Sequence, residues 1–318
     1  MQKTQLFPIA ILSGLVMCLL AATGFAGEHG AHVKGSADAP TMESSASRCA
    51  QNADDTFCWM GPDIGQAWAS GYTGSGVSIT IVDDFRSSEV IDGDLGLGPQ
   101  RQRHGEWVFD AAGMVAPGAN MFRNEYAQPT SIALQDGLNV FNLSYAHLEP
   151  VARSSLQQSI VDAALAGDAV FTKAAGNDAA PVGTVNSAGD FDYLAASLMG
   201  APSTIFVGAL EHNGTPENKA SLASYSNYPG SNREVQNQFL TVGVEGDKTG
   251  LFGTSLGAPV ISGYSAILGS KFPSATPTQI ANQLLDTART DTLVNYNSRT
   301  YGRGEASLSR ALAPDWIR

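Results

Sequence analysis

Charged side chains are scarce in this chain of 318 residues, of which only 15% are Asp, Glu, Lys or Arg. The scarcity, with no block of like charges, disfavours disordered and coiled-coil proteins. Basic residues are the scarcer kind: 18 Lys and Arg stand against 30 Asp and Glu, a net charge of −12. Such a surface gives a phosphate backbone no electrostatic reason to bind, and we expect no nucleic acid partner.

Long hydrophobic runs are absent except at the start, where Leu6–Phe25 is almost uncharged and ends in small residues. The run is typical of an export signal that is cleaved after Ala26. An uncleaved anchor is the alternative, because the run is about long enough to span a bilayer. A lipid anchor on Cys18 is disfavoured, since Met17 is too large for the position before a lipidated Cys. We therefore predict a signal peptide over residues 1–26 and a secreted or periplasmic protein without membrane contact after cleavage.

Cysteine is nearly absent. Of the three Cys, Cys18 lies in the predicted signal, which leaves Cys49 and Cys58 as an even pair. In an exported protein such a pair predicts a disulfide bond, with two free thiols as the alternative. A zinc site is disfavoured because no further Cys or suitably spaced His completes four ligands.

The remaining sequence alternates between strand-like and helical segments, and its 43% hydrophobic content is enough for a buried core. The strand-like runs are Val77–Val82, Ala119–Phe122, Val140–Leu143, Ala169–Thr172, Thr204–Val207 and Phe239–Val244. The helical segments are Ile64–Ser70, Ala152–Ala166 and Ala258–Leu268. This alternation predicts an α/β fold with a mostly parallel sheet covered by helices on both faces. We expect a flexible leader over residues 27–48 and one catalytic domain over residues 49–318.

Ser255 stands in a setting that suits a nucleophile. It lies between small residues in Gly253–Gly257, just before a helical segment whose N-terminus offers N–H groups to an oxyanion. A helix-capping Ser is the alternative. The α/β-hydrolases use the same spacing, but they need a His after the nucleophile, and all five His of this chain precede Ser255.

Asp83, His104 and Ser255 follow one another in an order that suits acyl transfer. Ser255 is a weak nucleophile by itself and needs a base, which His104 is best placed to supply. Asp83 ends an apolar strand and would hold the imidazole in the correct tautomer. We interpret the neighbouring Asp84 as a solvated turn residue. The positions of the His and Asp residues also allow a triad in which the His precedes the Asp. Proteases with that order have all-β barrels, which the alternation of strands and helices disfavours.

Seven segments resemble, in order, the motifs of the subtilisin-like serine proteases, or subtilases. They are Gly76–Asp83, His104-Gly105 with Val108, Val115–Ala119, Phe141–Tyr145, Ala174–Asn177, Gly253–Pro259, and Tyr301–Gly304 with Ala306. Together they cover roughly residues 62–313, and their strength lies in their order. The resemblance implies a subtilisin-like three-layer α/β fold, with helices on both faces of a mostly parallel sheet.

The resemblance also implies the roles of individual residues in a serine endopeptidase. Asp83, His104 and Ser255 would form the catalytic triad. The side-chain N–H of Asn177 and the backbone N–H of Ser255 would form the oxyanion hole. An extended peptide would pair with backbone groups that follow the fourth motif; these belong to Ser144, Tyr145 and Ala146.

The segment after His104 departs from the family pattern. Where the family usually has Thr, His, Val, Ala and Gly, the chain has Glu106, Trp107, Val108, Phe109 and Asp110, so that three small residues are replaced by large or charged ones. We expect Glu106 to raise the pKa of His104 if the two are close, and the aromatic rings to need room in a packed helix face. A catalytically silent subtilase-fold binding module is therefore the alternative to the endopeptidase, and an esterase is a variant of the enzyme.

For partners and cofactors, we expect a protein or peptide substrate, a monomer, and no required cofactor. Structural calcium is conceivable at a carboxylate-rich loop such as Asp92–Asp94. No EF-hand pattern is present, so the sequence assigns no metal ligands.

Overall fold

The computed structural model describes residues 51–52 and 55–317. The predicted signal peptide, the leader and Cys49 lie outside the described residues, so the disulfide between Cys49 and Cys58 stays a prediction. Within the described part, six parallel strands form one sheet in the order β4-β1-β5-β6-β7-β8. These strands are β1 (Val77–Asp83), β4 (Asn120–Glu125), β5 (Leu138–Leu143), β6 (Val170–Ala174), β7 (Thr204–Leu210) and β8 (Phe239–Gly243). A short antiparallel hairpin adds β2 (Ile91–Gly93) and β3 (Gln100–Gln102).

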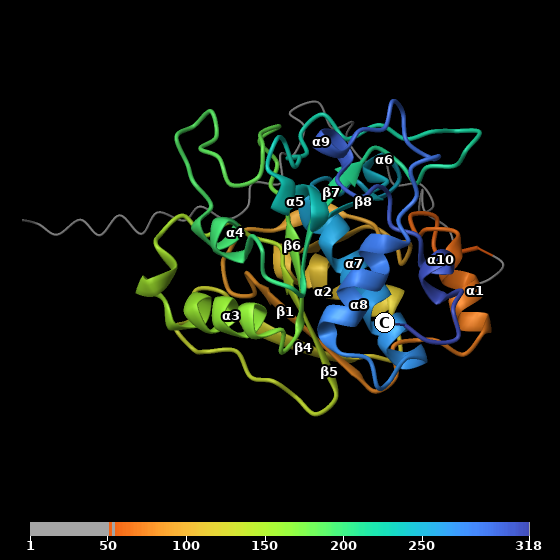
Figure 1. Ribbon diagram of the computed structural model, residues 1–318, viewed down its shortest axis with the longest axis horizontal. Coiled ribbons are helices and arrows are strands. Elements are labelled where there is room, and N and C mark those ends of the chain that lie inside the picture. Colours follow the sequence, from red (N-terminus) through yellow and green to blue (C-terminus); the bar gives the residue numbers. More distant parts are fainter. Residues whose placement is uncertain (1–50, 53–54, 318) are drawn as a thin grey trace, which may run out of the picture.

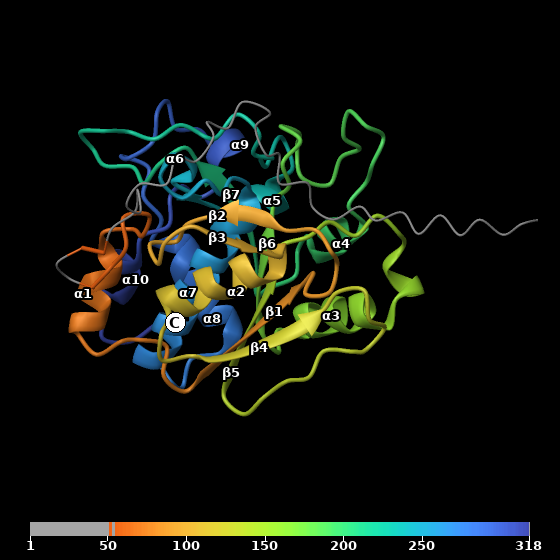
Figure 2. The same ribbon diagram turned by 180° about the vertical axis from the view of Figure 1, so that it is seen from behind.

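Helices cover both faces of the sheet, as the alternating sequence predicts. The helices are α1 (Asp63–Ala69), α2 (His104–Val115), α3 (Ser155–Ala166), α4 (Tyr193–Leu198), α5 (Arg233–Asn237), α6 (Gly246–Thr249), α7 (Thr254–Lys271), α8 (Pro277–Asp286), α9 (Ser298–Tyr301) and α10 (Leu308–Leu312). In Figure 1, α3 and α4 lie on one side of the strands and α7 and α8 on the other. Figure 2 shows α2 in front of the sheet, on the same side as α7. The predicted three-layer α/β fold is confirmed.

The two faces of the sheet bury separate apolar cores. Side chains of a strand point alternately to opposite faces, so that Ile79 and Ile81 of β1 join the core under α2 and α7, while Val82 joins the core under α3. On the α3 side, the rings of Phe141 and Phe171 stack with their centroids 5.3 Å apart. Because both faces are covered, the central strands are mostly apolar and do not alternate regularly with charged residues, although Lys173 of β6 is buried among them.

All six predicted strands form, with ends that differ by a few residues, whereas two helices differ in where they begin. The predicted helix Ala152–Ala166 begins at Ser155, because Ser154 adopts an extended conformation and its side chain accepts a hydrogen bond from the Gln157 N–H. The predicted helix Ala258–Leu268 begins earlier, at Thr254, and so contains Ser255 rather than following it.

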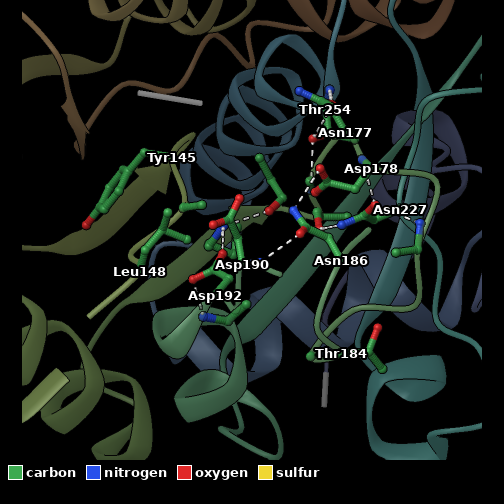
Figure 3. Close-up of a pocket in the computed structure, with 18 of the residues that line it drawn as sticks. Tyr145, Leu148, Asn177, Asp178, Thr184, Asn186, Asp190, Asp192, Asn227 and Thr254 are labelled. Atoms are coloured by element: carbon green, nitrogen blue, oxygen red, sulfur yellow. Dashed lines mark hydrogen bonds and ion pairs between the residues drawn. The ribbon is translucent and has the colours of Figure 1, made fainter. Parts of the chain in front are cut away.

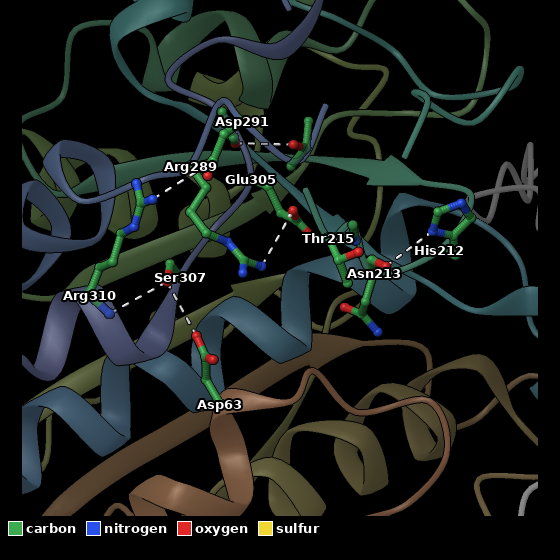
Figure 4. Close-up of polar contacts among 12 residues, drawn as sticks. Asp63, His212, Asn213, Thr215, Arg289, Asp291, Glu305, Ser307 and Arg310 are labelled. Atoms are coloured by element: carbon green, nitrogen blue, oxygen red, sulfur yellow. Dashed lines mark hydrogen bonds and ion pairs between the residues drawn. The ribbon is translucent and has the colours of Figure 1, made fainter. Parts of the chain in front are cut away.

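A buried charge ties the C-terminal segment to the loops that follow β7 and α8 (Figure 4). Glu305 is 1% exposed, and its Oε1 accepts a hydrogen bond of 2.8 Å from the Gly214 N–H. Its Oε2 lies 3.4 Å from Nη2 of Arg289, which is also largely buried. Burial raises the pKa of Glu305, although Arg289 opposes that rise. The carboxylate therefore depends on Arg289 for its nearest positive charge.

We expect Arg289→Ala to lower the free energy of unfolding by about 3 kcal/mol, because it leaves a buried carboxylate without its counter-charge. Arg303→Ala is the matched control, since the ion pair of Arg303 with Asp286 is exposed at 41% and 63% of the side-chain areas. Its loss is expected to cost at most about 1 kcal/mol. Denaturant titrations of the three proteins at neutral pH measure both values, and equal losses would contradict a structural role for the buried pair.

Candidate active site

The three predicted triad residues meet at the carboxyl edge of the sheet. Asp83 is the last residue of β1, His104 the first of α2, and Ser255 the second of α7. Helices α2 and α7 pack closely against each other further along. At Gly263 of α7 there is no room for a side chain, because an added Cβ would lie 2.4 Å from Val115 of α2. Parallel α/β sheets collect their functional groups at this edge, because the strands end there and the following helices begin.

His104 and Asp83 form a short, mostly buried hydrogen bond. Nδ1 of His104 lies 2.6 Å from Oδ1 of Asp83, and the Asp83 side chain is 2% exposed. Burial tends to lower the pKa of His104, but the charge and hydrogen bond of Asp83, together with the charge of Asp84, outweigh it and raise that pKa. Nε2 of His104 has no hydrogen-bond partner among the described residues. The ring is therefore oriented by Asp83 and keeps its other nitrogen available.

Ser255 is buried and held from two sides by Ser144. Its carbonyl would normally accept the N–H of residue 259, but Pro259 has none, and the Ser144 hydroxyl donates to that carbonyl instead, over 3.1 Å. In return, Oγ of Ser255 donates to the Ser144 carbonyl over 3.2 Å. No hydrogen bond joins Ser255 to His104 in the described part of the chain. The predicted nucleophile and base therefore lie at the same edge of the sheet but are not hydrogen-bonded to each other.

Asn177 is oriented by the residue that precedes the nucleophile. Its Oδ1 accepts hydrogen bonds from the backbone N–H and the hydroxyl of Thr254, at 2.8 and 3.1 Å. The amide nitrogen, Nδ2, donates to no described residue and faces Gly253, where an added Cβ would lie 3.1 Å from it. Gly253 has a φ of 120°, which favours glycine. One side-chain amide N–H is thus left free next to the start of α7, whose first N–H groups also lack helical partners.

A cavity of about 640 Å³ opens beside these residues (Figure 3). The predicted substrate residues Ser144, Tyr145 and Ala146 line it together with Asn177 and Ser255. Ser144 and Tyr145 are buried, and the Tyr145 hydroxyl donates to Gln157 over 2.9 Å, which fixes this wall. The cavity therefore brings the predicted substrate residues together with Asn177 and Ser255, whereas Asp83 and His104 do not line it.

Sequence reasoning missed four charged residues of this cavity: Lys173, Asp178, Asp190 and Asp192. Lys173 is 1% exposed and pairs with Asp192 over 3.0 Å. The available signal was a lysine inside an otherwise buried strand, four residues before Asn177, because a lysine is almost never fully buried unless it is paired. The aspartates stand in loop sequence that carries no such signal.

The unusual residues after His104 are accommodated without disturbing it. Glu106 turns to Arg123, with 2.8 Å between Oε2 and Nη2, and its charge is not among those that shift the pKa of His104. Asp84, expected to be only a turn residue, does act on that pKa. Trp107 is buried in the core and donates its indole N–H to a backbone carbonyl over 3.0 Å. Glu106 and Trp107 thus have partners of their own within the fold.

The loop suggested for calcium uses its carboxylates locally. Oδ1 of Asp94 accepts the backbone N–H groups of Gly96 and Gly98, and Asp92 lies 3.6 Å from Arg101. Over residues 51–52 and 55–317, no three His, Cys, Asp or Glu side chains gather closely enough to hold a metal ion. Nor does any helix in this described part have the length and apolarity needed to cross a membrane.

Solved structures share the fold. The prenylagaramide maturation protease superposes with a TM-score of 0.54 over 79% of this chain and 98% of its own, at 18% identity. A protease from Pseudoalteromonas arctica gives a TM-score of 0.54 over 80% and 94% of the two chains, also at 18% identity. Identities this low bear on the fold alone.

Sequence comparisons give the family. Subtilisin DY of Bacillus licheniformis is 29% identical over 218 residues, which are 68% of this chain and 71% of the relative. Subtilisin E of Bacillus subtilis is 27% identical over 278 residues, covering 76% and 67%. The model of the subtilase family matches residues 114–304, more than half of the chain. The chain therefore belongs to the subtilase family.

Proposed function

We propose that this protein is an exported serine endopeptidase that cleaves peptide bonds through an acyl-enzyme on Ser255. The observation that carries the proposal is the 2.6 Å bond from Asp83 to Nδ1 of His104, with Nε2 of the same ring unpartnered at the sheet edge that holds Ser255. Membership of the subtilase family supports serine hydrolase chemistry. Export rests on the predicted signal peptide.

The first step needs Ser255 to change partners. Its Oγ now donates to the carbonyl of Ser144, a group that an extended peptide could engage with its own backbone N–H. Substrate binding would then release Oγ, which the proposal requires to pair with Nε2 of His104. Geometry of this kind often tightens only when substrate is bound.

In the proposed reaction, His104 accepts the Ser255 hydroxyl proton while Oγ attacks the peptide carbonyl carbon. Asp83 keeps the imidazole oriented and stabilises its cation. The oxyanion accepts hydrogen bonds from Nδ2 of Asn177 and from the Ser255 N–H. His104 then gives the proton to the leaving amine, and water releases the acyl group by the same route in reverse.

One observation favours the second candidate, a catalytically silent binding module: Oγ of Ser255 is bonded to Ser144 and not to His104. A silent protein would keep that arrangement when a peptide binds. An esterase would use the same residues as the endopeptidase and differs only in the substrate it accepts.

We expect a fluorophosphonate to label the mature protein at Ser255, and the labelling to vanish in Ser255→Ala and in His104→Ala. Peptide hydrolysis should fall by at least about 10⁴-fold in both variants, and by about 10²–10³-fold in Asn177→Ala. Ser265→Ala is the matched control, because Ser265 lies in the same buried helix and bonds only to the Ile261 carbonyl. Intact mass and tandem mass spectrometry locate the adduct. A folded wild-type protein that stays unlabelled, with or without calcium, would leave the binding module as the better account.

The pH dependence of kcat/KM follows from the raised pKa of His104. The base works only when neutral, so activity should rise with pH through a midpoint above the usual value of about 6.5. Asp84→Asn removes one of the negative charges that hold this pKa up, and the midpoint should move to lower pH. Glu106→Gln is the control and should leave the midpoint in place, because Glu106 is paired with Arg123. A larger shift in the control than in Asp84→Asn would refute this assignment.

A further inference from the structure

The cavity beside Ser255 is large enough to take a long side chain. Small residues make up much of its wall: Ala146, Ala174, Ala175, Gly176, Ala180 and Gly183. These residues offer apolar contact to methylene groups, and Tyr145 and Leu148 are the larger side chains beside them. With a volume of about 640 Å³, the cavity has room for a lysine or arginine side chain and the water around its head.

Two of the four charged side chains in the cavity neutralise each other. Nζ of Lys173 lies 3.0 Å from Oδ2 of Asp192 and also donates to the Ala174 carbonyl over 2.8 Å. Oδ1 of Asp192 accepts the N–H groups of Leu194 and Ala195 at the start of α4. The Lys173–Asp192 pair thus has its hydrogen bonds within the protein, and it adds no net charge to the cavity.

The other two charges are carboxylates without a cation. Among the described residues, neither Asp178 nor Asp190 forms an ion pair. Asn186 connects them: its Nδ2 donates to Oδ1 of Asp178 over 3.1 Å, and its Oδ1 accepts the Asp190 N–H over 2.8 Å. Figure 3 shows this bridge beside Asn177, the residue that directly precedes Asp178. The loop is therefore held in place with two uncompensated negative charges on the cavity wall.

We propose that this cavity binds the side chain that precedes the cleaved bond, and that Asp178 and Asp190 make the protein prefer lysine or arginine there. The inference rests on the proposed function and names its substrate class. It draws on two independent features: a cavity that opens at the nucleophile, and an excess of negative charge on its wall. A basic head would supply the missing positive charge, while its stem would lie along the small apolar residues.

An acidic side chain is the competing occupant, because Lys173 also lines the cavity. Nζ of Lys173 has one N–H beyond those directed at Asp192 and the Ala174 carbonyl, but Asp192 already offsets its charge. Asp178 and Asp190 would repel an acidic side chain. The charge pattern therefore favours a basic side chain over an acidic one.

The test compares peptides that are identical except for Lys, Arg, norleucine or Glu before the cleaved bond. Norleucine keeps the length of the lysine stem without its charge. We expect kcat/KM for Lys to exceed that for norleucine by at least about tenfold, with Glu lowest. In the double variant Asp178→Asn, Asp190→Asn, the Lys to norleucine ratio should fall to within about threefold of one, and in the wild-type protein the ratio should fall as salt is added.

Asp162→Asn is the matched control, because Asp162 is an exposed acid on α3 that bonds only to Gln158 and does not line the cavity. It should leave the Lys to norleucine ratio unchanged, which separates the cavity charges from the net charge of the protein. The proposal is overturned if wild type prefers norleucine or Glu, or if the double variant keeps the wild-type ratio.

A binding measurement separates this proposal from the proposed function. Fluorescein-labelled alanine hexapeptides with one central Lys or norleucine are titrated against Ser255→Ala, and their anisotropy gives the dissociation constants. Tighter binding of the Lys peptide that is lost in the Asp178 and Asp190 double variant supports the cavity assignment, even if the wild-type protein cleaves nothing. Equal binding of both peptides counts against it.

Discussion

The burial of α7 is the constraint on which the site depends. Every residue of this helix from Thr254 to Gly269 is buried, and the helix packs against the central strands and against α2. Ser255 therefore cannot move as a loop residue could, and whatever meets it must come to the edge of the sheet. Pro259 removes one hydrogen bond from the first turns of the helix, and Ser144 restores it from the end of β5. The strand that would take substrate is in this way fastened to the nucleophile's own carbonyl.

Two buried carboxylates of the described residues, Asp83 and Glu305, each have an oppositely charged or hydrogen-bonding partner. Asp83 is bonded to His104, Glu305 faces Arg289, and each pair joins segments that are distant in the sequence. Breaking such a pair leaves a desolvated charge, which costs more than the pair contributes. The same principle applies after His104, where Glu106 is partly exposed and has Arg123 as its own partner. Besides Asp83, the acid that raises the pKa of His104 is Asp84, which the sequence analysis interpreted as a turn residue.

Hydrophobic patterning predicted the sheet well, because the central strands are mostly apolar and Gly-rich turns separate several of them. The sequence placed Asp83 at a strand end and Ser255 near a helix start, and strand ends and helix starts converge at one edge of a parallel sheet. Helix starts were harder to place. Ser154 is the N-cap of α3, so this helix begins later than predicted, and α7 begins inside a Gly-rich motif that resembles a turn. The charged residues of the cavity could not be predicted for another reason. The path of a long loop brings Asp178, Asp190 and Asp192 to the cavity, and no local sequence periodicity encodes that path.

The net charge of −12 and the charge of the cavity are different quantities with different consequences. A surface charge acts through solvent and is screened within about 10 Å at ordinary ionic strength, so it attracts basic peptides without choosing where they are cut. A carboxylate on a cavity wall acts at contact distance, where its effect on one substrate side chain is larger. Lys173 offsets the charge of Asp192. The uncompensated charges of the cavity are therefore those of Asp178 and Asp190, the two residues that Asn186 bridges. The proposed selectivity therefore rests on the two uncompensated carboxylates rather than on how many acids the chain carries.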